Sequence, residues 1–242
     1  VMIATNVSIL STGNKMKTLL LNGCSFGQFW NPTDHFVSSL GCDSLTNISR
    51  FSTSFQRTCR TTVEWIAQNG NPEFVLIPIT FCHRWELAIN KTEDQIDGTW
   101  FPLQRKELID EYKNELSSDV DVDKLKNMLD LYYGSIPTVN TYWDKMFTEI
   151  IMLSSFLESR DIKHLFFDMC NEFDKKHING HKGFDKVKLI ESNKNIVDLF
   201  NFCGNRYMWN SMADNDNVDL NTHHAPEQLK HLEKYLLTCI NQ

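Results

Sequence analysis

Four short apolar runs have the length and composition of buried β-strands. The clearest is Glu73–Thr80, whose apolar positions are continuous instead of alternating, as in a parallel strand that is covered on both faces. Lys17–Asn22 is an apolar run that ends at the turn pair Asn22-Gly23, and His164–Met169 is a third such run. Asp43–Ile48 has a weaker pattern of the same kind. These runs predict four strands.

Five other segments have the character of helices. In the first of them, Val63, Ile66 and Ala67 are spaced as on one helix face. In the third, Asp119 or Asp121 is a suitable N-cap. The predicted helices are Arg57–Gln68, Arg105–Leu116, Val122–Tyr133, Thr141–Ser159 and Pro226–Ile240.

The predicted strands alternate with the predicted helices, which favours an α/β fold with a mostly parallel sheet and helices on both faces. We expect one domain over residues 16–242, because Met16-Lys17 looks like a natural start and residues 1–15 form a polar extension. Residues 84–140 are more helical and charged than the rest and are expected to form an insertion. In such folds the chemistry lies in loops at the carboxyl ends of the strands.

Composition and charge narrow the class of protein. The chain has 242 residues, of which 41% are apolar and 23% charged, as is typical of globular domains. Its net charge is −7 and its Lys and Arg residues are scattered, so nucleic-acid binding is not expected. None of the seven cysteines has metal-site or CxxC spacing, which indicates reduced thiols. Without a secretory signal or an apolar stretch of ~18–20 residues, we expect a cytoplasmic protein with no membrane span; the sequence leaves its oligomeric state open.

Two patterns look like metal sites but lack essential ligands. Asp214–Asp219 starts like a calcium loop, yet position six is not glycine and position twelve, Ala225, is not glutamate. His177 and His181 are four residues apart, but no glutamate follows the first and Asn-Gly would break the helix that a zinc protease needs. We therefore expect no metal and no cofactor.

The first candidate for chemistry is Ser25, in the G-x-S-x-G sequence Gly23–Gly27. A serine on a tight turn after a strand can attack a substrate while nearby N–H groups face the developing oxyanion. The same residues also fit a helix N-cap with turn glycines. The nucleophile turn of α/β-hydrolases comes in mid-chain, whereas Ser25 follows the first predicted strand. Cys24 is an alternative nucleophile, although only one of two adjacent side chains on a turn can face a site.

The candidate general base toward Ser25 is His223. It lies just before the last predicted helix, and the upstream carboxylate of Asp219 is placed to orient its other ring nitrogen. His224 is an alternative base. A pair of exposed loop histidines beside a helix start is the structural alternative.

Together, these two ends of the chain resemble the SGNH (GDSL-type) hydrolase family. Leu19–Gly27 is similar to the family's first block, with Cys24 where Asp is usual, and Thr222–Glu227 is similar to its last block. Asn47–Ser54 resembles the second block, and Phe74–Thr80 the strand that leads into the third. The resemblance implies a three-layer α/β/α sandwich with a flavodoxin-like sheet. It also implies hydrolysis of a carboxylic ester, for example a carbohydrate O-acyl or O-acetyl ester, through an acyl-serine intermediate.

The resemblance also assigns the groups that hold the oxyanion. They are backbone N–H groups on the Gly27 side and at Ser52, where the family has a glycine. Thr80 stands where the family has an asparagine side-chain donor, and Asp219 is one residue away from the family's Asp-x-x-His spacing. These departures leave open a Ser–His dyad, or a catalytically impaired SGNH-like binding module for a glycan or another small ligand. A nucleotide-binding domain is a third interpretation, although Gly23–Gly27 lacks the lysine and the glycine spacing of a P-loop.

Arg84 and Glu86 follow the strand Glu73–Thr80, at the rim of the predicted site. They are candidates to clamp a substrate carboxylate or to order the loop as an ion pair. A solvated surface pair is the more common outcome for such residues.

Overall fold

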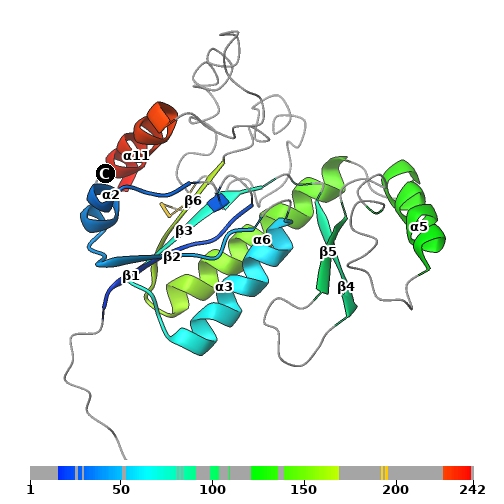
Figure 1. Ribbon diagram of the computed structural model, residues 1–242, viewed down its shortest axis with the longest axis horizontal. Helices are drawn as coiled ribbons and strands as arrows, with labels where there is room; N and C mark the ends of the chain where they lie inside the picture. The colour runs from blue at the N-terminus through cyan, green and yellow to red at the C-terminus, as the bar shows by residue number, and fades with distance from the viewer. Residues whose placement is uncertain are drawn as a thin grey trace, which may run out of the picture.

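A computed structural model shows an α/β fold. It describes residues 16–24, 27–28, 30–50, 53–80, 82, 84–90, 99–103, 109, 121–135, 139–168, 192, 194–195 and 226–240. Within these residues, four parallel strands form a sheet in the order β2-β1-β3-β6 (Figure 1). Their bounds are Thr18–Leu21 (β1), Ser44–Asn47 (β2), Phe74–Ile79 (β3) and Lys163–Asp168 (β6). Because all four strands are parallel, their carboxyl ends lie at one edge of the sheet.

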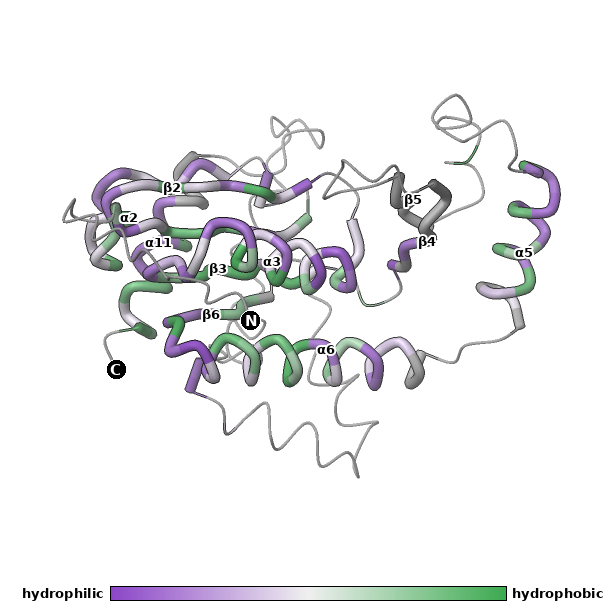
Figure 2. The backbone as a smooth tube through the Cα atoms, turned by 90° about the horizontal axis from the view of Figure 1, so that it is seen from below, coloured by the Kyte–Doolittle hydropathy of each residue, from purple (hydrophilic) through white to green (hydrophobic). Residues whose placement is uncertain are grey.

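Helices pack against both faces of this sheet (Figure 1). α3 (Phe55–Asn69) and α6 (Val139–Ser159) contact one face, and α2 (Asp34–Ser39) and α11 (Pro226–Ile240) the other. Successive strand residues point to opposite faces, so the strands supply both cores. The strand residues on the α3 and α6 side are Leu20, Val75, Ile77, Ile79 and Phe166, and those on the α2 and α11 side are Leu19, Leu21, Phe74, Leu76, Leu165 and Phe167. Figure 2 shows hydrophobic residues along β3, β6 and much of α6.

The central strand β3 is buried along its whole length and contains Pro78. A proline inside a sheet normally removes a ladder hydrogen bond. The carbonyl oxygen of Leu76 accepts a hydrogen bond from the N–H of Asn22 (3.1 Å), so Leu76 faces β1, and Pro78 two residues later faces the same side. However, β1 pairs with β3 only as far as Leu76. The N–H that Pro78 lacks would therefore point to a place beyond the end of the pairing with β1, so no ladder hydrogen bond is lost.

Each predicted helix that falls on described residues is confirmed, with ends that differ by at most two residues. α5 (Val122–Ser135) starts after Asp121, whose Oδ1 accepts from the N–H of Lys124 (3.0 Å), as expected for its cap. α3 starts after Ser54, whose Oγ accepts from the N–H of Arg57 (3.1 Å). The predicted helix Arg105–Leu116 lies outside the described residues except for Ile109. In the described part of the chain, no helix is both long and apolar enough to cross a bilayer.

The buried face of α3 differs from the face that its apolar spacing predicts. Ile66 is buried, but Val63 is 37% exposed and Ala67 is exposed. The other residues of α3 that are buried include the polar side chains Arg57, Thr58, Thr61 and Thr62. Threonine can be buried when its hydroxyl finds a partner, and apolar spacing alone does not reveal such a partner.

Three further elements have no counterpart among the predictions. One is α2, which is too short to show helical periodicity. The others are β4 (Trp85–Asn90) and β5 (Thr99–Leu103), which form an antiparallel pair. The segment 84–140, expected to be helical, therefore starts with strands. The polar extension 1–15 lies outside the described residues.

His164 lies buried at the start of β6. Its Nδ1 is 2.9 Å from the carbonyl oxygen of Ile162, which can only accept, so Nδ1 carries the proton. In the neutral ring, Nε2 accepts from the hydroxyl of Ser154 (2.9 Å). Burial lowers the pKa of His164 below its usual value, although the Ile162 carbonyl and the charge of Glu158 act in the opposite direction.

We expect the free energy of unfolding to decrease as the pH falls below about 6.5. In that range His164 binds a proton in the unfolded chain, whereas its lower pKa in the folded protein opposes protonation. Urea unfolding over a pH series measures this. His164→Gln is expected to lose less stability than wild type between about pH 7.5 and 5. His35→Gln, at an exposed position of α2, is the control, and equal pH slopes in wild type and His164→Gln would contradict the prediction.

Candidate functional site

The strand β1 ends at the point where successive connections between strands pass to opposite faces of the sheet. β1 has β2 on one side and β3 on the other. The connection from β1 to β2 contains α2, and the connection from β2 to β3 contains α3, which packs on the opposite face. In open α/β sheets, ligands bind outside the carboxyl ends of the strands at such a switch point. The described parts of segments 22–27, 47–54 and 79–86 lie at this edge.

Two glycines of the loop pack directly against Pro78. A Cβ atom on Gly23 would overlap Cγ of Pro78 and would lie 2.9 Å from the carbonyl oxygen of the same residue. A Cβ atom on Gly27 would lie 2.5 Å from Oγ of Ser49 and 3.1 Å from Cγ of Pro78. The two approaches to Gly23 are closer than a side chain tolerates, because they involve the ring and the backbone of Pro78. The close approach to Gly27 involves the hydroxyl of Ser49, which can rotate. Close packing against Pro78 therefore requires glycine at position 23, a reason for this glycine that is separate from the turn.

Hydrogen bonds join the loops that follow β1, β2 and β3. The carbonyl oxygen of Gly23 accepts from the N–H of Arg50 (3.0 Å) and from the hydroxyl of Thr53 (3.4 Å). The hydroxyl of Thr80 donates to the carbonyl oxygen of Thr53 (3.3 Å) and accepts from Nη1 of Arg84 (3.1 Å). The three loops thus hold one another in a fixed arrangement at the edge of the sheet.

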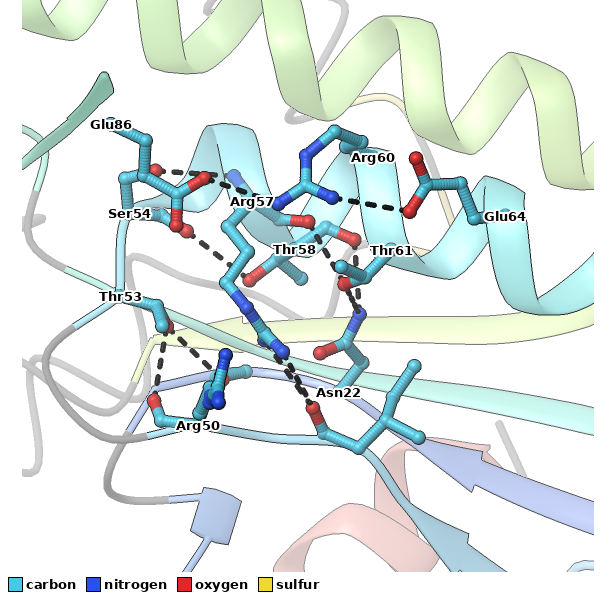
Figure 3. A network of polar contacts seen from close by, with 12 residues as sticks. Asn22, Arg50, Thr53, Ser54, Arg57, Thr58, Arg60, Thr61, Glu64 and Glu86 are labelled. Carbon is cyan, nitrogen blue, oxygen red and sulfur yellow. Dashed lines mark hydrogen bonds and ion pairs between the residues drawn. The ribbon is translucent and has the colours of Figure 1, made fainter. Parts of the chain in front are cut away.

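Asn22 attaches the end of β1 to α3 (Figure 3). Its side chain is fully buried, and Nδ2 donates toward the carbonyl oxygen of Thr58 (3.0 Å) and the hydroxyls of Thr61 (2.9 Å) and Thr62 (2.8 Å). Nδ2 has two hydrogens, so the three acceptors share them. Sequence reasoning treats Asn22 only as part of a turn pair. Two features of the sequence could have indicated this contact: a polar residue at the end of an apolar strand, and the threonines of α3.

Glu86 is buried and pairs with α3 (Figure 3). Its Oε2 lies 3.6 Å from Nη2 of Arg60, whose Nη1 contacts Glu64 at 3.1 Å. The side chain of Glu86 is 1% exposed, so the expectation of a solvated surface group is wrong for this residue. Its ion pair connects the start of β4 to α3. Nearby, the buried guanidinium of Arg57 donates to the carbonyl oxygen of Ile48 (3.3 and 3.4 Å).

The structure places half of the predicted site residues. Gly27, Thr80 and Arg84 belong to the joined loops, and Glu86 faces α3. Cys24 is fully buried. The remaining predicted site residues, Ser25, Ser52, Asp219, His223 and the alternative base His224, lie outside the described residues.

Glu233 of α11 attaches the C-terminal helix to the segment after the β1 loop. Its carboxylate is buried and accepts from the N–H (2.9 Å) and the hydroxyl (2.7 Å) of Thr33, and from Nε1 of Trp30 (3.4 Å). These partners are about two hundred positions apart in the chain. This contact brings α11 to the segment that precedes α2.

No protein-family model matches the chain, and no curated protein sequence matches it. Among the described residues, no group of three or more His, Cys, Asp or Glu side chains has an arrangement that suits a metal ion.

We expect Gly23→Ala to lower the free energy of unfolding by about 1–3 kcal/mol, because the methyl group overlaps the ring and carbonyl oxygen of Pro78. Gly134→Ala is the matched control. Gly134 lies in α5 with nothing within 4 Å of a Cβ atom, so alanine there is expected to be neutral or stabilising by up to about 1 kcal/mol. Urea unfolding measures both changes, and equal stability of the two variants would show that the close packing is unimportant.

Proposed function

We propose that the protein is a serine hydrolase that cleaves a carboxylic ester through an acyl-serine intermediate. The observation that supports this most is the packing of Gly23 and Gly27 against Pro78 at the switch point of the sheet. In the proposal, Ser25 stands between these two glycines as the nucleophile. A rigid frame around the nucleophile and its neighbouring N–H groups is what acyl transfer needs.

We also infer the finer class of the fold, a three-layer α/β/α sandwich with a flavodoxin-like sheet. The order β2-β1-β3-β6 matches the first four strands of the order 2-1-3-4-5 when β6 is counted as the fourth parallel strand. Helices on both faces and the all-parallel pairing support this inference.

In the proposed reaction, His223 accepts the proton of Ser25 while Oγ attacks the carbonyl carbon of the ester. When the tetrahedral intermediate collapses, the bond to the alcohol oxygen breaks and His223 returns the proton to that oxygen. Water then attacks the acyl-serine in the same way, which releases the acid and restores the serine. Asp219 would orient His223. The reaction needs no cofactor.

Backbone N–H groups on the Gly27 side and at Ser52 would hold the oxyanion. The hydroxyl of Thr80 is a weaker candidate, because its proton already lies toward the carbonyl oxygen of Thr53. Oγ of Ser49 is buried beside Gly27 and has no hydrogen-bond partner in the described part of the chain.

The attachment of α11 supports a role for His223. Glu233 binds Thr33 and Trp30, which follow the loop of Ser25. His223 is three residues before α11 in the sequence, and three residues of chain span at most about 11 Å. We therefore propose that the last loop of the chain reaches the loop after β1.

The proposed substrate is a small-molecule or carbohydrate ester, for example an O-acetyl sugar. The alternative is an impaired binding module of the same fold that recognises a glycan or another small ligand. The engaged hydroxyl of Thr80 favours the alternative, as do Cys24 and the displaced Asp219, because each departs from the family's catalytic pattern.

The test is covalent labelling of the purified protein with a fluorophosphonate, located by peptide mass mapping. We expect stoichiometric label on Ser25, no label in Ser25→Ala, and labelling slowed by about 10²–10⁴-fold in His223→Ala, because the general base is lost. Cys24→Ala is expected to keep the label, which separates the hydroxyl from the neighbouring thiol.

Hydrolysis of p-nitrophenyl acetate by the same variants provides an independent reading. Unlabelled wild type without esterase activity would refute the hydrolase and favour the binding module. Label that persists in Ser25→Ala would assign the nucleophile elsewhere.

A further inference from the structure

The segment Gly23–Gly27, called here the Ser25 loop, is held at both ends by asparagine amides. At its start, Asn22 is buried against α3, as described above. At its end, Nδ2 of Asn47 donates to the carbonyl oxygen of Gly27 (2.8 Å) and lies 3.3 Å from that of Trp30. Asn47 is the last residue of β2, so a neighbouring strand holds the point where the loop ends.

The other end of the Asn47 amide is also engaged. Oδ1 accepts from the N–H of Ser49 (3.0 Å), which fixes the orientation of the side chain. Ser49 in turn lies against Gly27, where a Cβ atom would be 2.5 Å from Oγ. Asn47 therefore connects the loop after β1 with the loop after β2 through one donor and one acceptor.

We propose that Asn47 is a positioning residue for Ser25: its amide holds the carbonyl oxygen of Gly27 and thereby the exit of the Ser25 loop. This inference rests on the proposed hydrolase function. Asn47 is itself exposed and is not a catalytic residue. We infer that it keeps the nucleophile and the neighbouring N–H groups in a fixed relative position. Small displacements of catalytic groups reduce reaction rates strongly.

The chemistry of the contact requires an amide. A carbonyl oxygen only accepts hydrogen bonds, so the side chain opposite Gly27 must donate. An aspartate in place of Asn47 would have the same shape and would still accept from Ser49, but it would place a carboxylate oxygen against the carbonyl oxygen. Asn47→Asp therefore removes the hydrogen bonds that Nδ2 donates to Gly27 and Trp30, while leaving the one that Oδ1 accepts from Ser49 in place.

The matched control is Asn71→Asp. Asn71 is also exposed, its Nδ2 donates to a backbone carbonyl, that of Arg160 (3.1 Å), and its Oδ1 accepts from the side chain of the same arginine (3.2 Å). It lies before β3, at the opposite edge of the sheet from the Ser25 loop. Both variants exchange an amide for a carboxylate and add the same charge.

The experiment measures the second-order rate of fluorophosphonate labelling at Ser25, together with hydrogen–deuterium exchange of peptides that cover residues 23–30. In Asn47→Asp we expect labelling to be slower by about 10–100-fold and exchange of these peptides to be faster, while Asn71→Asp matches wild type in both. As the pH is lowered toward the range in which the introduced carboxylate is protonated, the ratio of the variant's rate to the wild-type rate is expected to recover, because the protonated carboxyl can donate to Gly27.

The outcomes separate the two proposals. Labelled wild type with an equally fast Asn47→Asp overturns the positioning role while the hydrolase stands. Wild type that does not label refutes the hydrolase and with it the positioning of a nucleophile. Exchange over residues 23–30 that is equal in Asn47→Asp and Asn71→Asp overturns the role of Asn47 in holding the loop, whatever the activity.

Discussion

Pro78 leaves no room for a side chain at the point where the chain leaves β1. Its missing N–H costs no ladder bond, because β1 stops pairing with β3 at Leu76. Its ring then fills the space beside the end of β1, where only glycine fits at position 23, and it also lies close to Gly27. The same contact brings the loops after β1, β2 and β3 close enough for the carbonyl oxygen of Gly23 to accept from Arg50 and Thr53.

Polar groups buried around this contact make the arrangement specific. An unpaired amide or hydroxyl inside a protein is costly, so each such group favours the one arrangement in which it has a partner. Nδ2 of Asn22 donates to the threonines of α3, and Glu86 forms an ion pair with Arg60. Glu233 similarly fixes α11 to Thr33. The edge of the sheet that carries the candidate site is thus held by directional contacts, while the two faces are held by apolar packing.

The sequence predicts the fold well and the site less well, for physical reasons. Continuous apolar runs and helical spacing identify β1, β3, α6 and α11, because burial of apolar surface determines these elements. The pattern does not predict α2, which is too short to show a helical period. It also does not predict the hairpin of β4 and β5, because the charged character of residues 84–140 favours helices there. The apolar spacing also predicts the wrong buried face of α3, because threonines are buried there in place of apolar residues. The roles of Asn22, Asn47 and Glu86 depend on partners that are distant in the chain, and a single sequence does not show such pairs.

The central claim is that Ser25 is a nucleophile framed by Gly23 and Gly27. The most direct measurement is a crystal structure of the protein after reaction with a small organophosphate ester. The account predicts a phosphoryl group bonded to Oγ of Ser25, with one oxygen directed at backbone N–H groups on the Gly27 side and at Ser52, and with the ring of His223 within hydrogen-bond distance of the serine oxygen. An unmodified Ser25, or a serine that points away from both loops, would contradict the account.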